Sequence, residues 1–181
     1  MNKTALQSCL TEAFDQAKQI ALAANSEVFF KRPNPEQWSA AENLQHLTQS
    51  AEALNGLLAK GKGFIAEKWG LPSWSSRSYD DILTIYKQGL ANGIKAFGPF
   101  LPIIETGSDV ATLLQNFDAV NAKTMAFLTQ EWSDEDLDSH VIPHPALKAL
   151  TAREMFYFTA LHTRHHAELM LQRMAAQTIS H

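Results

Sequence analysis

The segment TAREMFYFTALHTRHHAELMLQRMAA, residues 151–176, predicts a long helix that determines the fold. It begins with Thr-x-x-Glu, a capping box in which Thr151 and Glu154 satisfy free amides of the first turn. One 100° arc of this helix holds apolar residues and three histidines: Met155, Phe158, His162, His165, His166 and Leu169. The histidines are therefore predicted to point into the protein and not into water.

Helical periodicity continues through the rest of the chain. Apolar residues spaced three and four apart predict further helices over residues 3–25, 39–61, 78–97 and 108–129. Ser39 and Glu42 form a second capping box. Residues 61–78 and 132–150 are expected to be long connections, and no alternation typical of strands is found. The pattern predicts an all-α four-helix bundle, with an extra short helix or long connecting loops, as a single domain over residues 1–181.

The composition is that of an ordinary globular chain, with 45% apolar residues, 19% charged residues and a net charge of −4. No cluster of Lys and Arg is present, which disfavours nucleic acid and anionic membranes as partners. No run of about 18 apolar residues predicts a membrane span, and the first residues lack the apolar stretch of a signal peptide. The single cysteine, Cys9, falls on an apolar helix face and fits a reducing compartment. We therefore expect a cytoplasmic protein.

The histidines of the last helix are candidate metal ligands, because neutral imidazole is a common ligand of zinc. His162 and His166 are four residues apart, so their rings lie on one helix face and can bind one ion. His165 competes with His166 for this role, since it is three residues from His162. A metal site in a helical bundle takes ligands from facing helices. His46, the one histidine in the first four predicted helices, is the natural third ligand.

Other residues near the predicted site have weaker assignments. His140 and His144 precede the last helix, and His144 is expected in a turn or in a lip over the site. His181 is the last residue of the sequence. Glu168 lies about 120° from His162 around the helix, so no general base is assigned. Residues 69–74, which include two tryptophans, are expected to help shape the pocket.

Several motifs resemble the DinB-like family, which includes proteins related to thiol S-transferases, across most of the chain. The resemblance is carried by residues 38–47 (WSAAENLQHL), 77–81 (RSYDD), 144–154 (HPALKALTARE) and the cluster of His162, His165 and His166. It implies a four-helix core that binds a divalent ion, often zinc or nickel, through one histidine of the second helix and two of the last. On this chain those ligands are His46, His162 and His166.

The resemblance also bears on function. Some relatives transfer low-molecular-weight thiols, and others isomerise substrates with a thiol cofactor. Members often have Gln where this chain has Leu169, so a polar group expected near the site is missing here. A homodimer is also expected from the resemblance, although the sequence indicates no interface.

A three-histidine site leaves one coordination position free, as is typical of catalytic zinc. Such a site can activate a thiol for transfer or a water for hydrolysis. Our first hypothesis is thiol-dependent transfer to a small-molecule substrate. Two alternatives remain: a non-enzymatic helical domain in which the ion or the histidine cluster is structural, and a helical interaction protein without metal. A cavity leading to the ligands favours the enzyme, and a fourth protein ligand favours the structural role.

Overall fold

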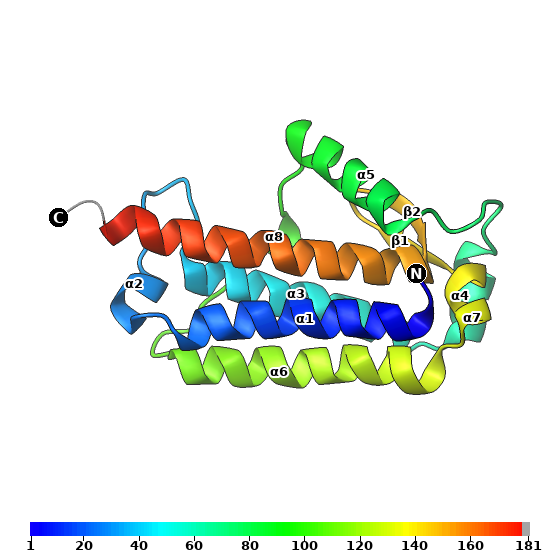
Figure 1. The fold of residues 1–181 in the computed structure, drawn as a ribbon, viewed down its shortest axis with the longest axis horizontal. Helices are drawn as coiled ribbons and strands as arrows, with labels where there is room; N and C mark the ends of the chain where they lie inside the picture. Colours follow the sequence, from blue (N-terminus) through cyan, green and yellow to red (C-terminus); the bar gives the residue numbers. More distant parts are fainter. Residues whose placement is uncertain (179–181) are drawn as a thin grey trace.

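The computed structural model describes residues 1–178, in which four long helices form a bundle (Figure 1). These helices are α1 (Lys3–Leu22), α3 (Ala40–Leu58), α6 (Val110–Ala126) and α8 (Ala152–Thr178). Helices α1 and α3 each pack against both α6 and α8. The prediction of an all-α bundle is therefore confirmed.

The core of the bundle is formed by the apolar faces that the helical periodicity predicts. On α1 the buried residues recur at spacings of three and four: Leu6, Cys9, Leu10, Ala13, Phe14, Ala17 and Ala21. Cys9 is buried among these apolar residues. The predicted place of Cys9 on the apolar face of its helix is confirmed.

The start of α8 is held by the predicted capping box. The Glu154 amide donates to Thr151 Oγ1 (3.2 Å), and the Thr151 amide donates to the Glu154 carboxylate (2.8 Å). Glu154 is fully buried, and its carboxylate also accepts from Nε and Nη2 of Arg77, each at 2.8 Å. The pair connects the segment before α5 (Tyr79–Ala91) to the first turn of α8.

Two short helices lie outside the helices predicted from the sequence. Helix α4 (Lys62–Trp69) occupies half of the expected loop over residues 61–78, and Gly61 (φ 85°) and Gly70 (φ 76°) flank it. Helix α2 (Ser26–Phe30) begins after an N-cap at Asn25. Helices of this length have too few turns to give a clear periodic pattern, so the sequence did not indicate them.

Helix α5 ends at Ala91, earlier than the predicted end near residue 97. Gly93 adopts a left-handed conformation (φ 84°), its amide donates to Leu90 O, and the amide of Ile94 donates to Gly89 O. These two bonds form a Schellman motif, which ends a helix at a glycine. The apolar residues that follow continue the helical spacing in the sequence but not in the structure.

The segment before α8 contains more structure than predicted. It forms helix α7 (Asp134–Ser139) and a two-stranded antiparallel sheet of β1 (Val141–His144) and β2 (Lys148–Thr151). The expectation of no strands is therefore wrong for this hairpin, whose four-residue strands are too short to show an alternating pattern. Helix α6 also continues into a π-helical turn, Phe127–Glu131.

The additional elements cover α8 and one end of the bundle. Helix α5 and the β hairpin both contact α8, and Figure 1 shows them on its outer side. The segment 92–109 returns from α5 to α6, and its 3₁₀ turn, Gly98–Phe100, contacts α3. Across residues 1–178, no helix combines the length and the apolar character that crossing a membrane requires.

Candidate metal centre

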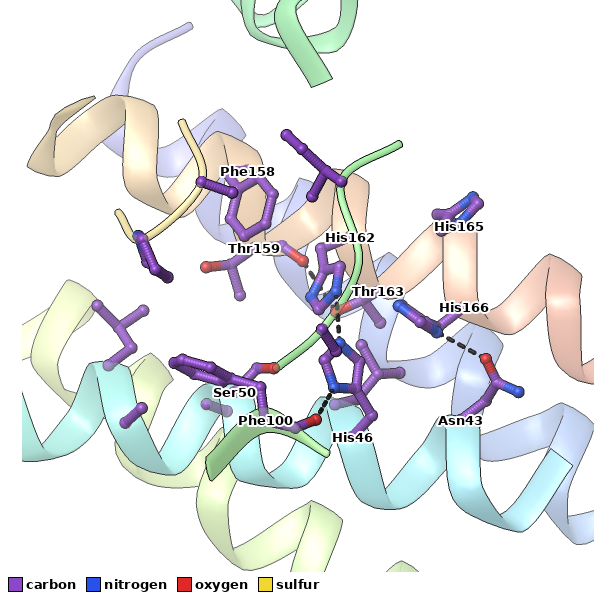
Figure 2. Close-up of a pocket in the computed structure, with 18 of the residues that line it drawn as sticks. Asn43, His46, Ser50, Phe100, Phe158, Thr159, His162, Thr163, His165 and His166 are labelled. Carbon is purple, nitrogen blue, oxygen red and sulfur yellow. Dashed lines mark hydrogen bonds between the residues drawn. The ribbon is translucent and has the colours of Figure 1, made fainter. Parts of the chain in front are cut away.

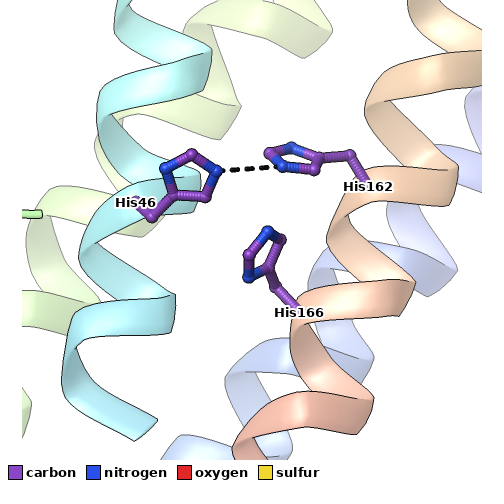
Figure 3. Close-up of side chains that lie close together, drawn as sticks. All are labelled: His46, His162 and His166. Atoms are coloured by element: carbon purple, nitrogen blue, oxygen red, sulfur yellow. Dashed lines mark hydrogen bonds between the residues drawn. The ribbon is translucent and has the colours of Figure 1, made fainter. Parts of the chain in front are cut away.

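Three histidines from two facing helices meet inside the bundle. His46 lies on α3, and His162 and His166 lie on consecutive turns of α8. One ring nitrogen from each histidine lies within 4.8 Å of the others, and Nε2 of His46 is 3.0 Å from Nε2 of His162. Figure 3 shows the three rings pointing toward one another from the two helices. The structure thus brings together the three residues that the sequence nominates.

Two oxygen acceptors bind the Nδ1 atoms of His46 and His166 and so orient these rings (Figure 2). His46 Nδ1 lies 2.7 Å from the carbonyl oxygen of Phe100, and His166 Nδ1 lies 2.7 Å from Asn43 Oδ1. Asn43 Nδ2 donates to Ser39 O, so its oxygen faces the ring. Because both acceptors can only accept, each Nδ1 carries a proton and each Nε2 keeps its lone pair for an ion.

The arrangement fits a divalent metal ion. Zn–N bonds of about 2.0–2.1 Å in tetrahedral geometry separate ligand nitrogens by about 3.3 Å, close to the 3.0 Å between His46 and His162. Without an ion, this contact is a hydrogen bond that His162 Nε2 donates, and an ion would take the place of that proton. Three imidazoles without a thiolate or carboxylate are a donor set that suits zinc and similar ions.

Burial keeps the three rings neutral. It lowers the pKa of His162 and His166 well below the usual value, and neighbouring histidines lower it further. Burial also lowers the pKa of His46, although its hydrogen bond to Phe100 O opposes the shift. Neutral imidazole is the form that binds metal. Competition from protons is therefore expected at a pH below 6.5, the value for an unperturbed histidine.

Acidification from pH 7.5 to 5 should destabilise the metal-free chain. The buried histidines have lower pKa values in the folded chain than in the unfolded chain. Between pH 7.5 and 5 the unfolded chain therefore binds more protons, and stability decreases as the pH is lowered. For His144, whose pKa burial lowers to about 4, the loss at pH 5 is about 2 kcal/mol. Urea unfolding at both pH values measures it, and His144→Gln should reduce the loss by a similar amount. Equal stability at the two pH values would contradict this account.

Replacing Asn43 by alanine should weaken metal binding by about 10–100-fold, because the ring of His166 loses the acceptor that orients it. Metal titration followed by calorimetry measures the change. Asn55→Ala is the matched control. Asn55 is also a buried amide of α3, but it bonds to Val120 and Thr124 and not to a histidine. Equal metal affinity in the Asn43 variant and the wild type would show that Asn43 does not support the site.

A cavity of about 540 Å³ leads to the three histidines. Its walls come from α3, α5, α8, the segment 92–109 and the β hairpin, and they are mainly apolar and aromatic (Figure 2). Trp38 packs against His46 (5.1 Å between ring centroids), and Phe158 stacks on His162 (5.1 Å). A small organic molecule therefore has room beside the cluster, in mainly apolar surroundings.

The other predicted site residues are divided between the cavity and the surface. His165 lines the cavity but lies outside the three-histidine group. His144 ends β1 beside the turn of the hairpin and also lines the cavity, so it has features of both readings, a turn and a lip. Glu168 is exposed, in agreement with its predicted direction. His140 does not line this cavity; its ring packs on Trp132. His181 lies outside the described residues.

The expectation that residues 69–74 shape this pocket is wrong. Trp74, with Leu71 and Pro72, lines a different cavity that Arg153 also lines. Trp69 belongs to α4 and packs on Phe64. The segment that covers the histidines is instead residues 94–101, because α5 ends early and the chain then returns toward α3.

Sequence reasoning missed Tyr86 of α5. Its ring lies 6.2 Å from that of His162 and 5.7 Å from that of His165. The side chain is 6% exposed and lines the cavity. Burial raises the pKa of Tyr86, so the phenol stays protonated and can donate a hydrogen bond. The missing signal is the packing of α5 on α8, which no local pattern reveals.

Comparison with protein families agrees with this geometry. The model of the DinB superfamily matches residues 10–170, a range that contains all three clustered histidines. No curated protein and no solved structure matches the chain.

Proposed function

The chain belongs to the DinB superfamily, and from this premise we propose that it is a divalent-metal-dependent enzyme that transfers a low-molecular-weight thiol to a small-molecule electrophile. The proposed ligands are His46, His162 and His166, and the proposed ion is zinc or nickel. A divalent ion held there would lower the pKa of a thiol, so that its sulfur is deprotonated and nucleophilic at neutral pH.

One observation carries the proposal: an incomplete ligand set faces a cavity. Within residues 1–178, no fourth histidine, cysteine or carboxylate joins the three-histidine group. A structural zinc site would be closed by a fourth protein ligand, whereas a catalytic site keeps a position for substrate. All three histidines line the cavity of about 540 Å³. This supports an enzyme over a purely structural ion.

The walls of the cavity favour thiol transfer over hydrolysis. Glu36 is the one carboxylate among the described lining residues, and it is exposed. A hydrolase that relies on a carboxylate base to activate water would lack one beside the ion here, whereas a thiol can lose its proton to buffer before it enters. Apolar walls also exclude water, which would compete with the thiol for the electrophile.

Tyr86 has a role in the proposed reaction. Sulfur forms a bond to the electrophilic carbon, the bond from that carbon to the leaving atom breaks, and the leaving atom takes the electron pair. The phenol of Tyr86 donates a hydrogen bond to that atom as negative charge develops on it. Its raised pKa suits a donor that keeps its proton until the charge appears.

Thiol transfer should depend on metal and on Tyr86. We expect metal-loaded chain to conjugate thiols to 1-chloro-2,4-dinitrobenzene, and metal-free chain not to. Tyr86→Phe should lower kcat by about 100–1,000-fold with unchanged metal stoichiometry and little change in KM. A screen of several thiols with zinc, nickel, manganese and cobalt gives the rates, and elemental analysis gives the stoichiometry.

Each contrary outcome identifies an alternative. Metal-dependent ester or amide hydrolysis without thiol transfer would support a hydrolase. A stoichiometric ion that raises the melting temperature but supports no turnover would support a structural role. Absence of metal binding would support an interaction domain.

A further inference from the structure

The cavity that holds the histidine cluster also reaches a guanidinium. Arg173 lies seven residues after His166 on α8, which is about 10 Å along the helix axis, and both side chains line the cavity. Lys95 lines it as well, whereas Glu36 is the one acidic residue among the described lining residues. The lining therefore favours a ligand with negative charge.

Arg173 differs from every other arginine of the chain. Each of the others forms an ion pair: Arg32 with Glu42, Arg77 with Glu154, Arg153 with Asp134 and Asp138, and Arg164 with Glu12. Arg173 pairs with no carboxylate among residues 1–178, and its Nε is buried without a hydrogen-bond partner. An unsatisfied buried donor is unfavourable, which indicates that a ligand completes this position.

The side chain of Arg173 is placed to act with the cluster. Helical side chains lean toward the N-terminus of their helix, so Arg173 leans toward Leu169 and the histidines. The guanidinium and the histidines therefore line one cavity, about 10 Å apart along the axis of α8.

We propose that Arg173 binds a carboxylate of the substrate thiol whose sulfur reacts at the three-histidine cluster. The position of the sulfur rests on the function proposed above, and the anion site rests on the cavity lining alone. A planar guanidinium forms two parallel hydrogen bonds with one carboxylate. Phosphate sites usually add backbone amides of a helix N-terminus, whereas Arg173 lies in the C-terminal part of α8. The substrate class is a small thiol with a carboxylate about 7–10 Å from its sulfur.

A pair of thiols that differ in one group tests this inference. 6-Mercaptohexanoate and 6-mercaptohexanol have the same chain length, but the first ends in a carboxylate and the second in a neutral hydroxyl. Binding to cobalt-loaded chain is followed by the thiolate-to-cobalt absorption band, which reports affinity without turnover. We expect the wild type to prefer the carboxylate by about tenfold or more. Arg173→Gln should reduce that preference to about twofold or less, and Arg173→Lys should keep part of it.

The controls separate this inference from the proposed function. Lys123→Gln removes an exposed cation of α6 that does not line the cavity, so it should keep the full preference. Circular dichroism and cobalt stoichiometry show whether each variant folds and binds metal. Equal affinity of the wild type for both thiols, or an unchanged preference in Arg173→Gln, would overturn the carboxylate site alone. Absence of the band with both thiols would overturn the proposed function and the inference that rests on it.

Discussion

Replacing His46 by alanine should abolish metal binding and leave the helical content nearly unchanged. His46 is the sole member of the cluster on α3, so its loss leaves two imidazoles from one helix. Loss of an outer partner weakens metal affinity by about 10–100-fold, and loss of a ligand itself should exceed that range. The fold should tolerate the change, because it removes a buried polar ring and leaves the apolar contacts of α3 in place.

Elemental analysis and metal titration of the His46 variant test this expectation, with circular dichroism to follow helical content. His165→Ala is the matched control. His165 lies beside the cluster on α8 but outside the three-histidine group, so its variant should keep metal stoichiometry and affinity. Full stoichiometry in the His46 variant would remove His46 from the ligand set. Loss of metal in the His165 variant would instead place His165 among the ligands.

The largest loss of stability is expected from Glu154→Leu. Burial opposes ionisation of Glu154, but hydrogen bonds from Arg77 and Thr151 outweigh it and hold the pKa of the carboxyl below its usual value. The variant leaves the Arg77 guanidinium and two backbone amides without their acceptor. Removal of one partner of a buried ion pair costs about 3–5 kcal/mol. In a chain of this size, this lowers the melting temperature by about 10 °C.

Urea unfolding of the metal-free protein gives this loss of stability directly. Glu12→Gln removes a carboxylate that pairs with Arg164 on the surface, where its side chain is 71% exposed. That control should cost less than about 1 kcal/mol. Replacing Arg77 and Glu154 together by Met and Leu should recover part of the loss, because the charged guanidinium is then no longer left without a partner. A change below 1 kcal/mol in Glu154→Leu would mean that the pair does not hold the start of α8.

The histidine cluster could be predicted because its information is local. The spacing of His162 and His166 fixes their common face on any helix, and capping boxes at Ser39 and Thr151 set where α3 and α8 begin. The inward direction of the histidines on both helices follows from the apolar residues that share their faces. Convergence of His46 with the other two then depends only on α3 packing against α8, as the structure shows.

The surroundings of the cluster could not be predicted in the same way. Asn43 is recognisable only as a residue one turn before His46, and Phe100 contributes a backbone oxygen that has no sequence signature. Tyr86 reaches the cavity because α5 packs on α8. These features depend on the path of a connection and on packing between distant elements. Patterns along one helix contain neither kind of information.

The hydrogen bond between Phe100 O and His46 determines which sequence changes this segment can tolerate. A main-chain oxygen is present whatever residue stands at position 100, so point substitutions there leave the acceptor intact. Insertions or deletions within residues 92–109 would instead shift the oxygen away from the ring. As far as this bond is concerned, homologous chains should therefore tolerate different side chains at position 100, while the length from Gly93 to Phe100 stays constant.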